Sequence, residues 1–518
     1  MTTATSSSTV QIQTHGALPT GDDFLASLRD DRHVYIHGRR IDDVSEHPAT
    51  RGSARSIARL YDAMHDPAHA ADLLAPIDDA GPPGRTHAFF PVKRDRDGLM
   101  QAQSAIACWA RLTYGWMGRT PDYKASLTST FGACPGWYGK FEANARRWYT
   151  KAQRELPFIA HAIVNPPIDR HLPVEDTGDV AVRVVSESSA GIRVRGAKVV
   201  ATSAALGNWV FVGQTPATAS DDDSMAMMFL APVAAEGVKI ICRASYEQAA
   251  ARHGGPTDYP LSSRFDENDA MLVFEDVLVP WENVLVHRDP KRVRSFFTGT
   301  GFVNNFLFHG CTRLAVKMEF MAGLLAKALR LTGGDEHRGN QAMLGEVVAY
   351  AHTFWSLSTA MASSPDAGGH DRYGDTPHVL PNRRAALAYS VLAPQAWSRV
   401  REIVQTSVAS GLIYLPSSAA DLANPEIDRL LAVYCRGSRG VGHAERIKVM
   451  KLLWDAVGSE FAGRHELYER NYAGSAEGVR LQAMGEAQRS GRLAAMEGLV
   501  DECLGDYDAA GWKPGAWR

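Results

Sequence analysis

The sequence predicts an α+β protein, mainly helical, in which a central β domain separates two helical regions. Apolar side chains follow helical spacing over residues 22–154 and again from about residue 296. Between them, residues 157–287 form short runs rich in Val, Ile and Phe, separated by Gly, Pro and Asp. Because successive strands without helices between them favour antiparallel pairing, we expect a central antiparallel sheet or small barrel.

The N-terminal region is predicted to be a helical domain at residues 1–156. Its first 20 residues are rich in Ser and Thr and bury too little apolar surface to offset the cost of ordering, so we expect a disordered tail at 1–20. Farther on, one helix face is formed by Ala102, Ala105, Ile106, Trp109 and Leu112. The β domain is placed at 157–290.

The C-terminal region, residues 291–518, is predicted to be a helical bundle. One long helix has its apolar face at Cys311, Leu314, Met318, Met321, Leu325 and Leu329. We expect it to stop at Gly333 and Gly334. A second helix contains Pro394, where we expect a kink. The segments FWSLSTAMASS and ERIKVMKLLWDAVGSEF predict two more helices.

The charge balance argues against polyanionic partners. The chain has 55 Lys and Arg against 58 Asp and Glu, a net charge of -3, with no long run of one sign. It therefore lacks the basic stripe that nucleic acid or an anionic membrane requires. No apolar stretch approaches the roughly 18 residues of a membrane span, and the start has no signal-peptide pattern. We expect a cytoplasmic protein.

Cysteine spacing and missing motifs exclude several classes of enzyme. The six cysteines are far apart and form no CxxC pair, so we expect them to be reduced and mostly buried. P-loop, HExxH, GxSxG and strand-linked GxGxxG motifs are absent. The HxE at His443 to Glu445 is followed by no PCxxC, so a zinc deaminase is excluded and no metal is expected.

The segment GWMGRTPDYKAS is a candidate anion site. Thr120, Pro121 and Asp122 form a typical helix start, with an N-cap, a first-turn proline and an acid at the positive end of the dipole. Arg119 and Tyr123 then lie around one helix N-terminus, where they could hold an anionic oxygen such as a phenolate. A capped helix with a surface arginine explains the same pattern.

Two histidines remain open to two interpretations. His161 lies in the apolar run FIAHAIV, either as a hydrogen-bonded core residue or as an imidazole that accepts a proton from a bound hydroxyl. His309, near Cys311, is assigned to core packing because no second pair of metal ligands is in view.

Two further segments could approach a ligand. Glycines near Gly458, beside Arg464, would suit a phosphate or a flat ring, although helix termination explains them nearly as well. The polar loop at 215–224 has the length of a lid, with a surface hairpin as the alternative.

Six separated motifs, in order, are MGRTPDYKAS, HAIVNPPIDR, GAKVVAT, PLSSRFDEND, HGCTRLAVKMEF and GSEFAGRHELYERNYAG. Together they resemble the 4-hydroxyphenylacetate 3-monooxygenase oxygenase-component family over residues 22–515, and most of all its natural-product members that hydroxylate tyrosine-derived phenols. The resemblance implies an acyl-CoA-dehydrogenase-like fold with an N-terminal helical domain, a β-barrel and a C-terminal four-helix bundle, usually in a homotetramer. It also implies a two-component monooxygenase that receives FADH2 from a separate flavin reductase. With O2 it would hydroxylate a phenol, free or bound to a carrier protein, ortho to its hydroxyl through a C4a-hydroperoxyflavin.

The resemblance also implies the site residues. The family's catalytic, phenol-binding residues correspond to Arg119, Tyr123 and His161. Its flavin contacts correspond to Pro167, Ile168, Asp169, Arg170, Thr202, Gly458, Ser459, Glu460 and Phe461. Its substrate-loop contacts correspond to Gln214 and Thr215, although the acidic run Asp221 to Asp223 departs from the family pattern.

Three other classes remain as alternatives. A hydroxyacyl-CoA dehydratase of the same fold needs an iron–sulfur cluster, but only Cys108 and Cys134 lie in the relevant half, far apart. An acyl-CoA dehydrogenase needs a catalytic carboxylate in the bundle, for which Glu346 or Glu402 would serve. A non-enzymatic helical scaffold leaves GRTPDY and His161 unexplained.

Overall fold

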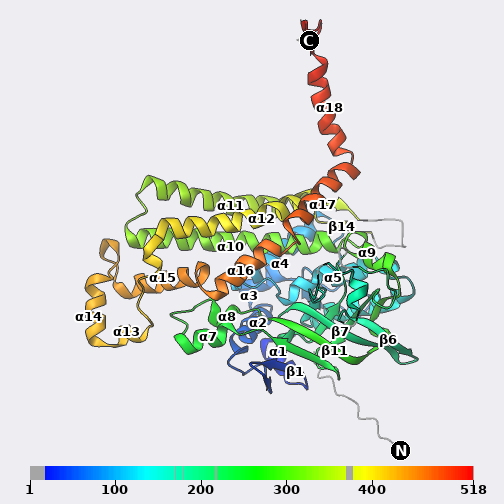
Figure 1. The fold of residues 1–518 in the computed structure, drawn as a ribbon, viewed down its shortest axis with the longest axis horizontal. Helices are drawn as coiled ribbons and strands as arrows, with labels where there is room; N and C mark the ends of the chain where they lie inside the picture. Colours follow the sequence, from blue (N-terminus) through cyan, green and yellow to red (C-terminus); the bar gives the residue numbers. More distant parts are fainter. Residues whose placement is uncertain (1–17, 170, 179, 216–218, 369–376, 517–518) are drawn as a thin grey trace, which may run out of the picture.

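The computed structural model describes residues 18–169, 171–178, 180–215, 219–368 and 377–516. A β-rich region lies against a layer of long helices, and the last helix projects away from both (Figure 1). The predicted order of helical, β and helical regions is confirmed. Most of the predicted tail and Arg170 lie outside the described residues.

The N-terminal region is mainly helical. Its elements are α1 (Gly21–Ser27), β1 (His33–Ile36), β2 (Arg39–Ile41), α2 (Arg51–Ala63), α3 (Pro67–Leu73), β3 (Leu74–Pro76), β4 (Arg85–His87), α4 (Arg96–Leu112), η1 (Pro121–Lys124), α5 (Ala125–Ala133), η2 (Pro135–Phe141) and α6 (Glu142–Glu155). The predicted apolar face at Ala102 belongs to α4 and is buried, except that Leu112 at its end is half-buried. The strands β1 and β2 were not predicted, since runs of three or four residues are too short to show a period.

The central region forms two packed sheets. Its elements are β5 (Ile159–Ala162), η3 (Val174–Thr177), β6 (Arg183–Ser188), β7 (Gly191–Thr202), η4 (Ala204–Leu206), β8 (Trp209–Val212), β9 (Met227–Pro232), β10 (Val238–Cys242), α7 (Tyr246–His253), α8 (Ser262–Phe265), β11 (Asp269–Pro280), η6 (Trp281–Asn283) and β12 (Val284–His287). One sheet has the order β2-β1-β10-β11-β7-β6 and the other β12-β9-β8-β5. Pairing is antiparallel, as predicted, except for the parallel pairs β1–β10 and β5–β8.

The C-terminal region is a helical bundle with an extension. Its elements are α9 (Pro290–Gly299), α10 (Phe302–Thr332), α11 (Arg338–Ser363), β13 (Asp366–Ala367), β14 (Val379–Leu380), α12 (Arg383–Val408), η7 (Ala409–Leu412), α13 (Ala420–Ala423), α14 (Pro425–Tyr434), η8 (Ser438–Gly440), α15 (His443–Val457), α16 (Glu460–Asn471), α17 (Ala476–Arg489), α18 (Arg492–Gly505), β15 (Tyr507–Asp508) and β16 (Gly511–Trp512). The predicted stop of α10 occurs at Gly333, whose φ of 71° favours glycine. Helix α12 runs without interruption through Pro394.

The helices of the bundle place charged groups deep in the molecule. Helix α10 contacts α11, α12 and α15, as well as α4 and α5 of the N-terminal region. Its first half is buried on every side and includes the polar side chains of His309, Arg313 and Lys317. A helix that is buried on all sides must pair its polar side chains with other buried groups of the protein. These pairings bring α10 and α16 together beside the site described below.

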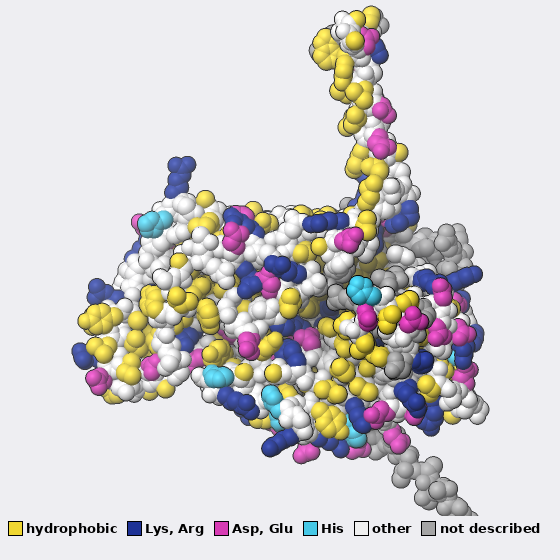
Figure 2. All heavy atoms as spheres, in the orientation of Figure 1, with side chains coloured by type: hydrophobic (Ala, Val, Ile, Leu, Met, Phe, Trp, Pro, Cys, Tyr) yellow, Lys and Arg dark blue, Asp and Glu magenta, His cyan; other side chains and the backbone are white. Residues whose placement is uncertain are grey.

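The C-terminal extension is an apolar arm. Helix α18 and the hairpin β15–β16 stand clear of the globular part (Figure 1), and apolar side chains run along them (Figure 2). Exposed apolar residues on α17 and the arm include Leu481, Met484, Met496, Leu499, Val500, Leu504, Tyr507 and Trp512. Elsewhere on the face shown in Figure 2, basic and acidic side chains are intermingled.

All six cysteines are free, four of them buried, as predicted. Within the described ranges, no helix combines the length and the apolar character that a membrane span requires.

Candidate active site

Arg119, Tyr123 and His161 meet at the junction of η1 and β5. The guanidinium carbon of Arg119 lies 4.2 Å from the centroid of the Tyr123 ring. The rings of Tyr123 and His161 are 5.6 Å apart, centroid to centroid, and inclined by 35°. Tyr123 and His161 are both buried. The structure thus brings together three residues from two distant sequence motifs.

The local structure of η1 differs in part from the predicted helix start. Thr120 has the extended conformation of an N-cap and Pro121 begins the turn, but the Thr120 side chain makes no capping hydrogen bond. Asp122 is buried, and its Oδ1 lies 3.3 Å from Nε2 of His309 on α10. The acid therefore pairs with a buried histidine rather than facing the helix dipole, and this pair lies behind Tyr123, whose ring centroid is 5.4 Å from that of His309.

Arg119 is held by residues of the C-terminal bundle and the β region. Its Nη1 donates a hydrogen bond of 2.6 Å to Oη of Tyr468, and its Cζ lies 4.8 Å from the ring centroid of Tyr472. Its backbone N–H donates to Glu267 Oε1 at 2.5 Å. Its Nε, which is buried, has no hydrogen-bond partner among the described residues. Arginine stays charged in proteins, so this group is a fixed cation with a donor to spare.

Protonation at the site is set by burial. Burial lowers the pKa of His161 well below its usual range, and the neighbouring Lys124 and Arg119 side chains lower it further. The imidazole is therefore neutral at neutral pH. Burial raises the pKa of Tyr123, which stays protonated. The site consequently offers one cation, one phenol hydroxyl and one neutral imidazole.

Lys124 is a site residue that sequence analysis did not single out. It follows Tyr123 directly, and its Nζ lies 4.9 Å from the centroid of the Tyr123 ring. Its position inside the motif MGRTPDYKAS could have pointed to it. It was passed over because a lysine at the start of a helix is ordinarily exposed to solvent.

The segment expected to contact flavin after His161 lies beside β7. Asn165 Oδ1 accepts a hydrogen bond of 2.6 Å from Nζ of Lys198, and Val164 forms a bridge with Val199. Pro167, Ile168 and Asp169 follow on the surface, where the Ile168 side chain is 65% exposed. An apolar side chain this exposed is available to cover a ligand.

Thr202 and α16 belong to one polar network. Asp269 Oδ1 accepts hydrogen bonds from Thr202 Oγ1 at 2.7 Å and from Arg464 Nη2 at 2.8 Å. Arg464 Nε also donates to Oδ2 of Asp269 at 2.9 Å, and its Nη1 donates to Glu267 at 3.4 Å. Arg464 is therefore engaged by two carboxylates, whereas the sequence left open whether the glycines beside it approach a phosphate or a flat ring or only end a helix. Through Glu267 the same network reaches the backbone of Arg119.

The predicted flavin contacts at the start of α16 have separate local roles. Gly458 precedes Ser459, whose Oγ caps the helix by accepting from the N–H of Ala462. Glu460 is exposed, whereas Phe461 is buried against Trp116.

Two polar atoms fit a bound cofactor in this region. Nδ2 of Asn165 and Oγ of Ser203, the residue after Thr202, are buried without a hydrogen-bond partner in the part of the chain that the structure describes. Buried donors and acceptors are normally paired. These two atoms, next to the segment at 167–169 and to Thr202, thus suit the polar edge of a flavin.

The predicted substrate loop is tied at its base. Gln214 is buried, and its Nε2 donates a hydrogen bond of 2.6 Å to the carbonyl oxygen of Met225. Thr215 follows it, and residues 216–218 lie outside the described part. The acidic run does not face the site: Asp223 pairs with Arg288 at 2.7 Å, and Asp221 pairs with Arg294 on α9.

The structure offers little support for the alternative classes. Glu346 and Glu402 both pair with Arg399 on the bundle surface, at 2.9 and 2.8 Å, so neither is poised as a base. Among the described residues, no group of three or more His, Cys, Asp and Glu side chains could hold a metal ion.

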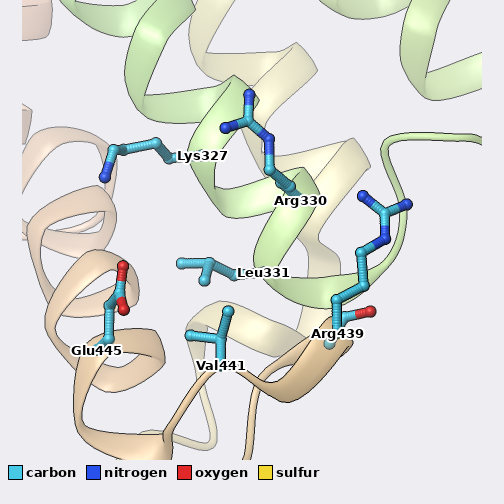
Figure 3. A pocket seen from close by; sticks show the side chains of 7 residues that line it. Lys327, Arg330, Leu331, Arg439, Val441 and Glu445 are labelled. Carbon is cyan, nitrogen blue, oxygen red and sulfur yellow. The ribbon is translucent and has the colours of Figure 1, made fainter.

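A cavity of about 150 Å³ lies away from these residues, between the end of α10 and the start of α15. In it Leu331 and Val441 point toward each other (Figure 3). Its remaining lining residues are Lys327, Arg330, Ser438, Arg439 and Glu445. It holds no residue of the predicted site.

The fold and the comparisons define the class of protein, a flavin-dependent aromatic monooxygenase of the two-component type. Residues 20–286 match the family described as 4-hydroxyphenylacetate 3-hydroxylase N terminal, and residues 293–501 match 4-hydroxyphenylacetate 3-hydroxylase C terminal. The chain belongs to the 4-hydroxyphenylacetate 3-monooxygenase oxygenase-component family.

Three relatives show the range of the family. A 4-hydroxyphenylacetate 3-monooxygenase oxygenase component from Pseudomonas aeruginosa is 54% identical over 95% of this chain and 94% of its own length. A 4-nitrophenol 2-monooxygenase oxygenase component from Rhodococcus is 48% identical, over 95% of this chain and 93% of its own length. A Streptomyces globisporus monooxygenase of (3S)-3-amino-3-(3-chloro-4-hydroxyphenyl)propanoyl-[peptidyl-carrier protein SgcC2] is 49% identical, over 95% and 92%.

A solved structure supports the cofactor. The oxygenase component of 4-hydroxyphenylacetate 3-monooxygenase, complexed with FAD and 4-hydroxyphenylacetate, superposes with a TM-score of 0.86 at 27% identity. The match covers 94% of this chain and 99% of that one. The predicted family, fold class and flavin cofactor are thereby confirmed.

Proposed function

We propose that this oxygenase component hydroxylates a 4-hydroxyphenyl substrate ortho to its hydroxyl, with Arg119, Tyr123 and His161 binding the phenol oxygen. The observation that carries the proposal is the convergence of these three side chains, one a fixed cation, one a protonated phenol and one a neutral imidazole. Reduced FAD from a separate flavin reductase, together with O2, is the co-reactant.

The three residues would favour the ionised substrate. Attack by an electrophilic oxygen requires an electron-rich ring, and a phenolate is far richer than a phenol. A phenolate beside Arg119 gains a charge-assisted hydrogen bond, and the Tyr123 hydroxyl can donate a second one. Neutral His161 can accept the phenol proton or hold it in a hydrogen bond. When bound, reduced FAD supplies the activated oxygen.

The flavin is proposed to lie where the predicted contact segments converge. Pro167, Ile168 and Asp169 adjoin β7 through Asn165, and Thr202 joins α16 through Asp269. Arg170 and the start of α16, residues 458–461, complete the proposed set. The unpartnered atoms of Asn165 and Ser203 support this placement.

The substrate is proposed to be a tyrosine-derived phenol, either free, as 4-hydroxyphenylacetate is, or attached to a carrier protein in natural-product biosynthesis. Two relatives whose sequences are nearly equally identical to this chain act one on a free phenol and the other on a phenol bound to a carrier protein. Gln214 and Thr215 are proposed to contact the part of the substrate beyond the ring. Asp221 and Asp223 are paired with arginines. We therefore propose that they stabilise the loop and do not contact the substrate.

We propose a homotetramer as the working assembly and the cytoplasm as its location, where a reductase can supply FADH2. The projecting arm supports assembly, since its apolar residues would otherwise face water.

An assay for catechol tests the proposed function. The chain is supplied with a flavin reductase, NAD(P)H, FAD, O2 and a panel of free and carrier-bound 4-hydroxyphenyl compounds. We expect O2-dependent catechol formation that is lost in Arg119→Ala and His161→Ala, while both variants still bind reduced flavin. Matched controls are Arg59→Ala and His253→Ala, which change exposed residues. Unchanged turnover in the Arg119 or His161 variants would refute the assigned roles.

A further inference from the structure

Lys124 is a buried amine at the centre of the site. It is the last residue of η1, and its side chain belongs to a residue only 1% exposed. Its Nζ lies 4.9 Å from the ring centroid of Tyr123 and 5.7 Å from that of Phe211. Lysine is almost never buried to this degree unless it is paired.

The strand register places this amine next to His161. His161 on β5 and Phe211 on β8 are direct partners in a parallel pair, so their side chains leave the same face of the sheet. Lys124 lies against Phe211, and both Lys124 and His161 lie against Tyr123. The amine, the imidazole and the guanidinium of Arg119 thus surround one tyrosine ring.

The amine has no polar partner among the residues that the structure describes. No hydrogen bond or ion pair joins Nζ of Lys124 to any described residue, unlike the buried amines of Lys93, Lys198 and Lys317, which all donate hydrogen bonds. An ammonium group buried without an anion is strongly disfavoured, so Lys124 is best accommodated as a neutral amine. The charged and titratable groups that face it are Arg119, Tyr123 and His161, none of them anionic.

We propose that Lys124 is a further catalytic residue, the group that takes the proton from the substrate's phenol hydroxyl. This role rests on the proposed function, because it requires the phenol oxygen to bind between Arg119, Tyr123 and His161. The O–H bond of the phenol breaks, its electron pair stays on oxygen, and the proton forms an N–H bond on the Lys124 amine. A neutral phenol and a neutral amine become a phenolate and an ammonium.

This transfer explains why the amine is buried with no polar partner among the described residues. In the free chain a neutral Lys124 needs no counter-ion. In the complex the new ammonium has one, since the phenolate is formed beside it. His161, also neutral, then serves as the hydrogen-bond partner of the phenol oxygen. The substrate enters as the phenol present at neutral pH, and the site ionises it without exchanging a proton with solvent.

The test follows the ionisation of a bound phenol without turnover. The full chain is loaded with FADH2 under anaerobic conditions and titrated with 4-nitrophenol, at a pH below the pKa of the free probe. The visible absorbance of 4-nitrophenolate reports ionisation. Calorimetry in two buffers of different ionisation enthalpy counts the protons released. We expect the wild type to bind the phenolate with no net proton release.

The variants separate a proton acceptor from a fixed positive charge. In Lys124→Met the apparent pKa of the bound probe should rise by at least about one unit. In Lys124→Arg, which keeps the charge but cannot accept a proton, phenolate should bind with release of about one proton. Lys93→Met, which removes another buried amine, is the matched control and should behave like the wild type. Thermal unfolding establishes that each variant is folded.

The possible failures are distinguishable. If the wild type does not bind the probe near Arg119, so that Arg119→Ala has no effect on binding, the proposed function itself fails. If the wild type binds phenolate but releases a proton, or if Lys124→Met binds phenolate equally well, only the role of Lys124 is refuted. Should Lys124→Met fail to fold, the proton count of Lys124→Arg decides the question.

Discussion

The hydroxyl oxygen of Tyr468 accepts a hydrogen bond of 2.6 Å from Nη1 of Arg119. The two residues are 349 positions apart in the sequence, one before η1 and one in α16. The Cζ atom of Arg119 also lies 5.1 Å from the centroid of the Tyr468 ring. The C-terminal bundle therefore sets the position of the cation that we propose binds the phenol oxygen.

Removing this hydrogen bond should impair catalysis without unfolding the chain. In Tyr468→Phe the ring still packs on Arg119, but the guanidinium loses one partner. A hydrogen bond to a charged group contributes about 1.5–3 kcal/mol, so we expect kcat/KM for catechol formation to fall by at least about tenfold. Tyr434→Phe, at an exposed tyrosine, is the control. A Tyr468→Phe variant with normal kcat/KM would show that Arg119 needs no support from α16.

Glu469 should be essential for stability. Burial opposes its ionisation, but Arg313 and Lys317 hold the pKa of Glu469 down at about 2. Its oxygens accept hydrogen bonds from Arg313 at 2.6 and 2.7 Å and from Lys317 at 2.9 Å. In Glu469→Gln two buried cations lose their anion, and we expect the free energy of unfolding to fall by about 3–5 kcal/mol. Urea denaturation measures it.

Lys317→Met provides the comparison for that variant. It leaves the two-point contact between Arg313 and Glu469 intact, and burial already lowers the pKa of Lys317 to about 7. We therefore expect a smaller loss of stability than in Glu469→Gln. Equal losses would mean that packing, rather than charge pairing, dominates the cluster.

Acid should destabilise the fold through His87. Burial lowers the pKa of this histidine from its usual 6.5 to about 4, and its ring packs 4.3 Å from that of Trp109. Between these pH values the unfolded chain binds a proton that the folded chain excludes. Stability is therefore lost as the pH falls from 6.5 toward 4, by about 1.4 kcal/mol per pH unit for this group.

The His87→Gln variant isolates that contribution. Urea unfolding measured at several pH values should show a shallower decline with acid than in the wild type. His253→Gln, at an exposed histidine, should retain the wild-type slope. An unchanged slope in His87→Gln would assign acid sensitivity to other buried groups.

The C-terminal arm should hold the proposed tetramer together. A chain ending at residue 490 lacks α18 and the hairpin β15–β16, which carry exposed apolar residues such as Leu499 and Val500. We expect light scattering after size-exclusion chromatography to show a smaller species, and Leu499→Asp to weaken assembly in the same direction. Glu497→Gln on the same helix should leave the assembly unchanged, and a tetramer that survives truncation would contradict the prediction.

The long elements and the site motifs could be predicted from the sequence. The apolar periods of α4 and α10 and the Gly333 stop are local properties, because a helix face and a helix cap depend on residues within one or two turns. The motif around Arg119 and Tyr123 was visible for the same reason. The short strands β1 and β2 were not, since β1 pairs with β10, about two hundred positions away, and β2 pairs only with β1.

By itself, the sequence determined the order of helical and β regions, the family and the candidate residues Arg119, Tyr123 and His161. Only the tertiary structure decided which groups surround them. It turned Asp122 toward His309, engaged Arg464 with Asp269, and placed Tyr468 on Arg119. It also buried the Lys124 amine with no polar partner in the described part of the chain. These outcomes depend on which charged groups are removed from water together, and that is a property of packing between distant segments rather than of any local pattern.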